Sequence, residues 1–172
     1  MNYLLYGTEK FLIDKEIKNI INKHKIEEIN VSKYDLELNS LNEILDDANT
    51  VSLFSSNKLI IVENSFVFSR VTAKKIENTE LLEHYLKQDN PDVTILFITH
   101  DMHLAIEYTD RSIVFADGEC IADDLVYKVL SNDEVISRAN LKHTSLVHIA
   151  NRLGIDPEEY IHHFIEFERG VL

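Results

Sequence analysis

The chain has 172 residues, of which 45% are hydrophobic, so it can build one packed core and at most a small appendage. Its formal net charge of −13 excludes a typical stand-alone nucleic-acid binder, because such proteins neutralise phosphates with Lys and Arg. The same sign disfavours an anionic membrane surface, whereas it fits a protein partner or simply good solubility.

Hydrophobic periodicity predicts strands and helices in alternation. Continuous apolar runs predict buried strands, and apolar positions three and four apart predict helices. Ser40 and Glu43 have the spacing of a capping box, Asp117-Gly118 is a hairpin signal, and Asp156-Pro157 marks a helix start. In chain order we expect strand Tyr3–Tyr6, helix Phe11–His24, strand Ile29–Tyr34, a helix opening at Ser40, strand Lys58–Asn64, helix Glu80–Gln88, strand Val93–Thr99, helix Leu104–Tyr108, strands Arg111–Ala116 and Cys120–Asp123, and three helical pieces from Leu125 onward.

This order of elements predicts an α/β fold with a mainly parallel sheet flanked by helices. We expect residues 1–124 to form the α/β domain and residues 125–172 to form a C-terminal helical extension. In such sheets the loop after the first strand is where a phosphate binds. That loop is therefore the first place to look for chemistry.

Cysteine content and apolar runs suggest a cytoplasmic chain. The single Cys120 excludes an internal disulfide and, within an alternating segment, is expected to be a small core residue. No apolar run approaches the roughly 20 residues of a membrane span, so we expect no membrane insertion. Residues 1–7 also lack the basic flank and the length of a signal peptide.

The loop after the first expected strand, Gly7-Thr8-Glu9-Lys10, is a degenerate phosphate loop. A working loop reads G-x-x-x-x-G-K-[ST], so that backbone amides and a Lys surround the phosphates. Here a second Gly is missing, Lys10 is misplaced, and Glu9 puts a negative charge where phosphate would lie. The later strand ends in Glu63 and Asn64, without the Mg²⁺-binding Asp of a Walker B site. We therefore expect no ATP, no other cofactor, no catalytic residue and no enzymatic activity.

Two segments, Leu4–Leu12 and Ala48–Val62, carry a resemblance to a known family. Together they resemble the N-terminal domain of the delta subunit of bacterial DNA polymerase III, a part of the clamp loader. The resemblance covers roughly residues 1–97. It implies an AAA+-like variant of the P-loop NTPase fold with a degenerate phosphate loop that does not hydrolyse nucleotide.

In that family a Ser-Leu-Phe segment at a helix end docks into the sliding clamp, and the matching residues here are Ser52, Leu53 and Phe54. Two adjacent large apolar side chains can fill a pocket and supply most of the energy of an interface. The residue pattern alone favours Leu53 and Phe54 covering the core before the next strand. The resemblance instead implies that they are exposed and bind the clamp, although Asn49 departs from the Gln common in clamp-binding peptides. The implied partners are the sliding clamp and other clamp-loader subunits.

From about residue 93 onward the chain resembles a second family. Ile98–His103, with Thr99-His100-Asp101 at its centre, resembles the switch-histidine loop of ABC transporter ATPases, and Tyr108–Gly118 resembles the segment after it. The resemblance covers roughly residues 93–172, is closest to the cobalt and energy-coupling-factor type, and implies that His100 contacts a γ-phosphate. The other ABC motifs are absent from the sequence, and the residues alone suggest a polar strand-end role for His100.

We therefore interpret the chain as a hybrid with a junction near residues 93–100. Its predicted function is that of a non-catalytic replication module that binds the sliding clamp, without strong nucleic-acid binding of its own. The alternative is a truncated or hybrid ABC transporter ATP-binding subunit without a working ATPase site.

Two further motifs are best explained by packing and by solvent exposure. Residues 145–156 resemble the opening of a helix-turn-helix, but the helix that follows is too acidic to approach DNA phosphates, which favours a packing pair. The adjacent His162 and His163 point to different helix faces, and no His-Glu-x-x-His spacing or Cys partner accompanies them. We expect no metal site.

Overall fold

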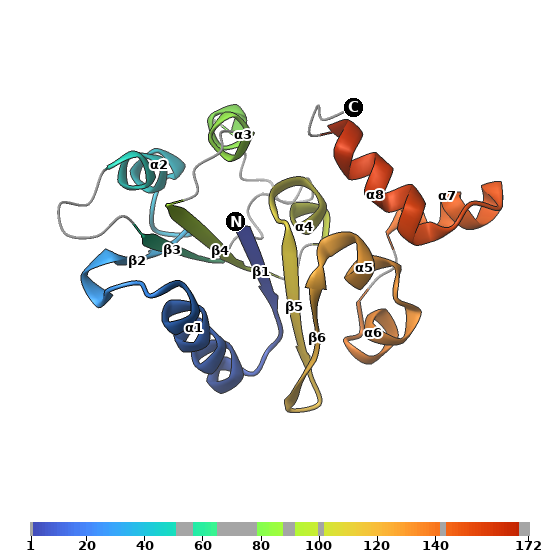
Figure 1. Ribbon diagram of the computed structural model, residues 1–172, viewed down its shortest axis with the longest axis horizontal. Helices are drawn as coiled ribbons and strands as arrows, with labels where there is room; N and C mark the ends of the chain where they lie inside the picture. Colours follow the sequence, from blue (N-terminus) through green and yellow to red (C-terminus); the bar gives the residue numbers. More distant parts are fainter. Residues whose placement is uncertain are drawn as a thin grey trace.

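The computed structural model describes residues 2–50, 57–64, 79–87, 92–99, 102–141 and 144–168. These residues form one six-stranded sheet with helices on both faces and further helices at the C-terminal end (Figure 1). The strands are β1 (Asn2–Tyr6), β2 (Val31–Asp35), β3 (Lys58–Glu63), β4 (Val93–Ile98), β5 (Arg111–Ala116) and β6 (Glu119–Leu125). The helices are α1 (Lys10–His24), the short 3-10 helix η1 (Glu28–Asn30), α2 (Leu41–Asn49), α3 (Thr79–Lys87), α4 (Met102–Tyr108), α5 (Val126–Ser131), α6 (Asp133–Arg138), α7 (Ser145–Leu153) and α8 (Pro157–Glu168).

The strand order is β2-β3-β4-β1-β5-β6, and every neighbouring pair is parallel except the last. β5 turns into β6 through Asp117 and Gly118, whose φ angles of 55° and 77° are both positive. Two central residues with positive φ define the tight hairpin turn that matches the twist of a sheet. The fold thus confirms the predicted mainly parallel α/β sheet, with β1 in its interior.

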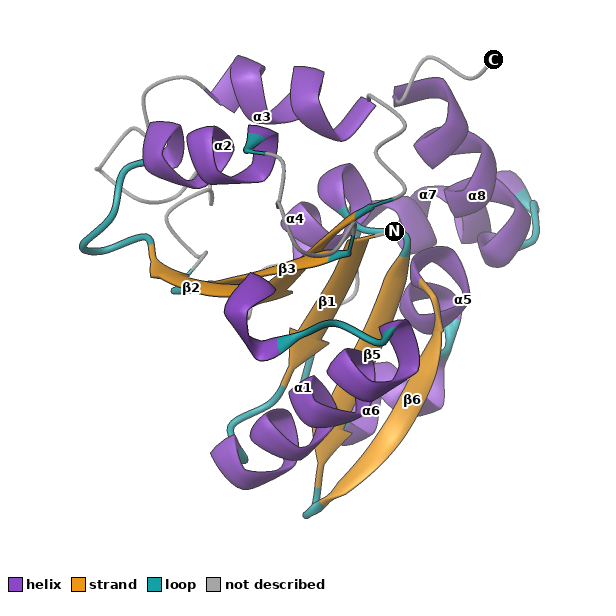
Figure 2. Ribbon diagram, turned by 60° about the vertical axis from the view of Figure 1, so that its left-hand side comes forward, coloured by secondary structure: helices purple, strands orange, loops and turns teal. Residues whose placement is uncertain are grey.

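The two faces of the sheet are covered by different helices (Figure 2). On one face, α1 packs Ile13, Ile17 and Ile20 against strand side chains such as Tyr3 and Leu5. The opposite face belongs to α2, α3 and α4, and the intervening strand residues point there because side chains alternate along a strand. Strands covered on both faces read as continuous apolar runs, which is why β3 and β4 could be recognised in the sequence.

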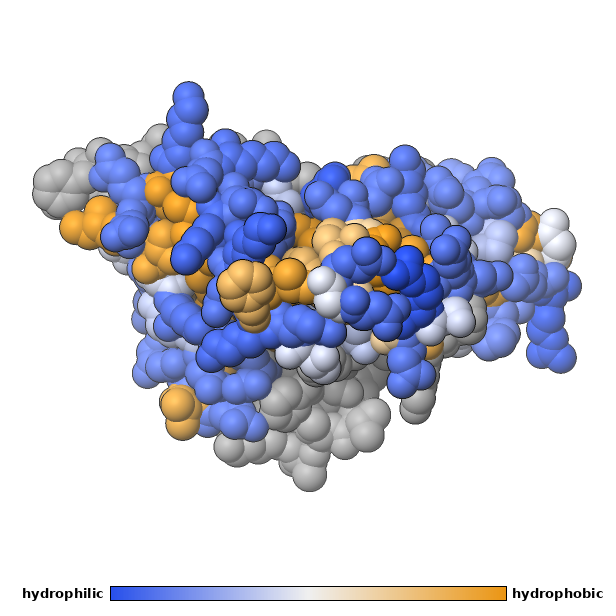
Figure 3. Space-filling model, turned by 90° about the horizontal axis from the view of Figure 1, so that it is seen from below, coloured by the Kyte–Doolittle hydropathy of each residue, from blue (hydrophilic) through white to orange (hydrophobic). Residues whose placement is uncertain are grey.

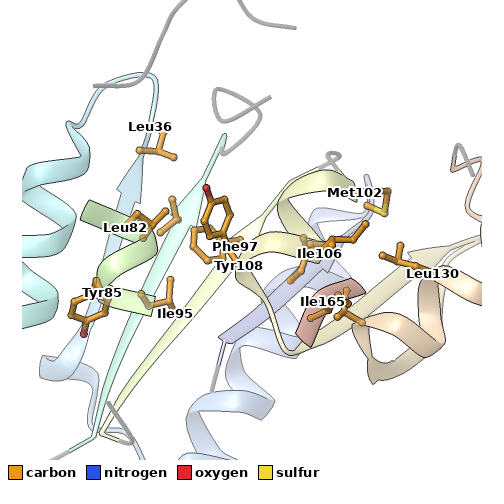
Figure 4. Packing of buried hydrophobic residues seen from close by; sticks show 14 of the residues in the cluster. Leu36, Leu82, Tyr85, Ile95, Phe97, Met102, Ile106, Tyr108, Leu130 and Ile165 are labelled. Carbon is orange, nitrogen blue, oxygen red and sulfur yellow. The ribbon is translucent and has the colours of Figure 1, made fainter. Parts of the chain in front are cut away.

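The larger core cluster continues from the sheet into the C-terminal helices (Figure 4). Phe97 of β4 and Ile106 of α4 belong to the same cluster as Leu130 of α5 and Ile165 of α8. All four side chains are buried. α4 therefore links the apolar face of the sheet with the helices that follow β6.

Three expectations from the sequence need correction. The segment after Leu125 forms four helices within the described residues rather than three pieces, because the Asn132 side chain accepts hydrogen bonds from the backbone N–H groups of Glu134 and Val135 and starts α6 immediately after α5. Cys120 is exposed rather than buried, because β6 is an edge strand with β5 as its partner. The strand expected from Ile29 begins at Val31, after η1.

Candidate functional site

The carboxyl ends of β1 and β4 form the position where an open α/β sheet would bind a ligand. β1 leads through α1 on one face, whereas β4 leads through α4 on the other, so the two connections part at this point. A crevice at such a switch point is the usual ligand site of the fold. In this chain β1 is followed by the Gly7–Glu9 loop and β4 by Thr99, whose backbone N–H donates to the carbonyl of Leu5 over 3.3 Å.

The loop between β1 and α1 is short and packed against the protein itself. Gly7 is buried, with a φ of 152°, and a Cβ placed on it would lie 2.7 Å from Cβ of Phe115 in β5. The backbone N–H of Lys10 donates to the carbonyl of Thr8 over 3.1 Å, so this amide is used within the loop. Gly7 thus serves close packing against β5, and the Lys10 amide is not available to a phosphate.

Glu9 places a carboxylate at the amino end of α1. It occupies the N-cap position, but its side chain makes no capping hydrogen bond. Its Oε2 is buried and has no hydrogen-bond partner among the described residues. A helix amino terminus attracts negative charge, so the protein's own carboxylate takes the place that a phosphate would need. A nucleotide phosphate would meet like charge there.

The acidic residue at the end of β3 is engaged in a contact between strands. Oε1 of Glu63 lies 2.8 Å from Nζ of Lys33 in β2. Beside it, hydrogen bonds from the Asn64 side chain and from the Glu37 backbone lower the pKa of Asp35. Within the part of the chain that the structure describes, no group of three or more His, Cys, Asp and Glu side chains could hold a metal ion. Glu63 therefore acts as a structural partner of Lys33.

Four of the residues singled out in the sequence lie outside the described residues: Ser52, Leu53, Phe54 and His100. Asn49, just before the expected docking segment, is the last residue of α2, and its side chain donates to the carbonyl of Leu45 over 2.8 Å. Thr8 and Lys10 are exposed.

The structure also reveals a partly buried polar cluster that the sequence did not single out. Nζ of Lys58, the first residue of β3, lies 3.0 Å from Oδ1 of Asp47, and the hydroxyl of Tyr34 donates to Oδ2 of the same carboxylate over 3.0 Å. Burial raises the pKa of Asp47, but hydrogen bonds from Ser32, Lys58 and Tyr34 outweigh it, so the net shift is downward. Burial and the bond to Asp47 raise the pKa of Tyr34. Asp47 is therefore held as an anion between α2, β2 and β3.

The last two helices, α7 and α8, form a packing pair, as the acidic residues of α8 led us to expect. α7 ends at Gly154, which has a φ of 69°, and α8 follows with its first turn capped by Asp156, whose Oδ1 accepts from the backbone of Glu159 over 3.1 Å. α8 buries Ile161 and Ile165 in the core. In the described ranges no helix is both long and apolar enough to span a membrane.

Several proteins share parts of this sequence. A protein named as an ABC transporter ATP-binding protein, CPE1583 of Clostridium perfringens, is 46% identical over 92 residues, which cover 53% of this chain and 16% of that protein. Its counterpart SAG1633 of Streptococcus agalactiae is 42% identical over 92 residues, covering 54% of this chain and 16% of that protein. The chain thus spans only 16% of the length of these relatives.

Similarity to the clamp-loader delta subunit covers a larger part of the chain. The Bacillus subtilis DNA clamp loader delta protein YqeN superimposes with a TM-score of 0.48 and 25% identity, covering 57% of this chain and 30% of that one. The family model for the DNA polymerase III delta subunit matches residues 3–114. Because 92 residues exceed the part of the chain outside that range, this match and the ABC similarity overlap. The match extends over more than half of the sequence, and the chain belongs to the DNA polymerase III delta subunit family.

Proposed function

We propose that the chain is a non-catalytic module of bacterial DNA replication that binds the sliding clamp through the segment Ser52–Phe54. The observation that carries the proposal is the delta-subunit match over residues 3–114, a range that includes this segment. The Leu53 and Phe54 side chains would enter a pocket on the clamp, as apolar anchors do in other interfaces. Other clamp-loader subunits are the second class of partner, and a replication role would place the chain in the cytoplasm.

Side-chain contacts at the carboxyl ends of the strands support a role without catalysis. Phe115 closes the space beside Gly7, and the Glu9 carboxylate lies at the amino end of α1. Glu63 is paired with Lys33, so the usual metal-binding acid of a nucleotide site is already engaged. A chain with this edge would act by binding other proteins, without ATP.

The charge of the chain favours a protein as its partner. Seen from below, apolar groups appear as patches separated by hydrophilic ones (Figure 3). The net charge of −13 argues against direct, strong binding to DNA or to an anionic membrane. Since a few side chains carry most of the energy of an interface, two adjacent apolar residues are enough to anchor a partner.

Surface plasmon resonance with an immobilised bacterial sliding clamp tests the proposal. Leu53→Ala/Phe54→Ala is expected to weaken binding at least about thirtyfold, because the loss of even one anchor costs about 2 kcal/mol or more. The matched control is Phe11→Ala/Leu38→Ala, which removes the same two side-chain types from positions that are 78% and 84% exposed. Equal affinity of the wild type and Leu53→Ala/Phe54→Ala would contradict the docking role.

The second candidate is a truncated or hybrid ABC transporter ATP-binding subunit without a working ATPase site. It is favoured by the 46% identity to the Clostridium perfringens protein over 92 residues. Calorimetric titration with Mg-ATP separates the two proposals. Clear binding by the wild type that is lost in His100→Ala would favour the ABC origin, whereas no heat in either protein would favour the clamp-loader role.

A further inference from the structure

The outer face of α1 gathers positive charge in an otherwise acidic molecule. Residues 10–25 contain five exposed lysines, which exceed Asp14 and Glu16 by three charges, so the rest of a chain with net charge −13 carries −16. None of the five forms an ion pair within the described residues, whereas basic residues of the sheet such as Lys33 and Arg111 do. The five are Lys10, Lys15, Lys18, Lys23 and Lys25.

Part of this face forms a ridge that points away from the core. The α1 ridge consists of Phe11, Lys15, Lys18 and Asn22, all of them exposed. They follow one another at spacings of four, three and four residues, so they share one side of the helix. The isoleucines that pack on the sheet belong to the other side. The ridge therefore presents an aromatic side chain, 78% exposed, in line with two ammonium groups.

Helix stability does not explain these charges. Lys23 lies in the last turn of α1, where the helix dipole favours a cation, and its Nζ lies 5.9 Å from the centre of the Tyr3 ring. Lys15 and Lys18 lie in the middle of the helix, and Lys10 lies at the amino end, where the dipole disfavours a cation. The lysines of the ridge thus have no local partner in the described chain that would account for them.

We propose that the α1 ridge binds a short acidic segment of a partner protein. Phe11 would enter an apolar site on that partner, while Lys15 and Lys18 would pair with its carboxylates. In protein interfaces, aromatic anchors carry most of the energy and complementary charges around them orient the partner. The ridge shares no residue with Ser52–Phe54, so it can be tested without the clamp.

The acidic surroundings of the ridge favour a short segment over an extended polyanion. α1 has 15 residues and is therefore about 22 Å long. β6, which carries Glu119 and Asp123, lies near α1, since burial and the charges of Asp123 and Glu16 raise the pKa of Cys120. A DNA duplex or an anionic membrane would extend beyond the ridge and meet these carboxylates. A segment no longer than α1 would meet mainly the lysines.

Fluorescence anisotropy with a labelled peptide tests this docking surface in the full chain. The probe is a short synthetic peptide in which glutamates flank one leucine, and the same peptide with glutamines is the control probe. Lys15→Gln/Lys18→Gln removes two charges of the ridge, and Phe11→Ala removes the aromatic anchor. Lys128→Gln/Arg152→Gln is the matched control, because it removes two exposed charges from α5 and α7.

The wild type is expected to bind the glutamate peptide and to release most of it when the salt concentration reaches about 0.5 M. Lys15→Gln/Lys18→Gln and Phe11→Ala should each weaken binding roughly fivefold, whereas the matched control should keep the wild-type affinity. The proposal is overturned if the wild type does not bind this peptide, if both α1 variants bind it as tightly as the wild type, or if the matched control loses as much affinity as they do.

Other occupants of the ridge are distinguished with the same proteins. Labelled duplex DNA and phosphatidylserine vesicles replace the peptide, and analytical ultracentrifugation measures self-association. Tighter binding of DNA or vesicles than of the peptide, lost in Lys15→Gln/Lys18→Gln, would assign the ridge to that occupant and overturn the proposal. Dimerisation that is lost in the same variant would overturn it in favour of a second copy of the chain.

Discussion

At the scale of single residues, the contacts of Gly7 and Glu9 determine what the β1–α1 loop can bind. A glycine after the first strand of an α/β sheet is usually read as a phosphate-loop residue. In this chain Gly7 is buried beside Phe115, and Glu9 directs a carboxylate into the protein at the amino end of α1. Both features leave the strand-to-helix turn intact but differ from a loop that presents backbone amides to a phosphate.

Gly7→Ala should therefore destabilise the fold by about 1–3 kcal/mol, through backbone strain and through overlap with Phe115. Urea denaturation followed by circular dichroism measures the change. The control is Gly118→Ala, because Gly118 also has a positive φ, of 77°, but a Cβ there would have no heavy atom within 4 Å. If the two substitutions cost the same, close packing against Phe115 is not what requires glycine at position 7.

At the scale of elements, α1 is attached to the sheet at its last turn. Nε2 of His24, the last residue of α1, lies 3.0 Å from the hydroxyl of Tyr3 in β1, and the C-cap residue Lys25 has a φ of 52°. Burial lowers the pKa of His24, and the positive charges of Lys23 and of the chain terminus lower it further. The neutral imidazole, which can accept a hydrogen bond from Tyr3, is therefore the favoured form in the folded protein.

Because of this pKa shift, the contribution of His24 to the free energy of unfolding depends on pH. Because the folded protein binds a proton at His24 less readily than the unfolded chain does, the contribution is complete above about pH 6.5 and falls as the pH drops through that value toward the lower folded pKa. We expect His24→Gln to flatten the stability profile between neutral and mildly acidic pH, measured by urea denaturation at a series of pH values. His84→Gln, at an exposed position in α3, should keep the wild-type slope; a wild-type slope in His24→Gln would contradict the assignment.

At the scale of the whole molecule, residues 1–124 and residues 125–172, which we expected to form two parts, contribute side chains to one apolar core. The largest apolar cluster contains Phe97 of the sheet, Ile106 of α4 and Ile165 of α8 (Figure 4). Parts that share one apolar cluster gain their stability from the same contacts. We therefore expect the sheet and the C-terminal helices to unfold together.

Ile165→Ala tests this expectation. Removing this buried side chain should cost about 2–5 kcal/mol and shift one common transition, seen alike by far-UV circular dichroism and by tyrosine fluorescence. Phe167→Ala, in the same helix but 68% exposed, should leave the transition nearly unchanged. A biphasic curve for Ile165→Ala, with only the helical signal lost early, would show that residues 125–172 form a separate lobe.

The sequence by itself determined the features that depend on neighbouring residues. Continuous apolar runs identified β3 and β4, the capping box at Ser40 identified the start of α2, and Asp117-Gly118 identified the β5–β6 turn. It also excluded a standard phosphate loop, because that motif requires particular residues at fixed spacing. These signals act over a few residues, so they survive without knowledge of the fold.

Only the tertiary structure decided which side chains are buried and what they contact. The sequence predicts a strand that begins at Lys58, but only the structure shows that this residue is buried, because the end of α2 supplies three acceptors to its ammonium. Cys120 reads as a core residue, yet it is exposed because its strand lies at the sheet edge. Phe115 reaches Gly7 only because β5 pairs with β1. Each of these outcomes depends on residues far apart in the chain, and a local pattern carries no information about such contacts.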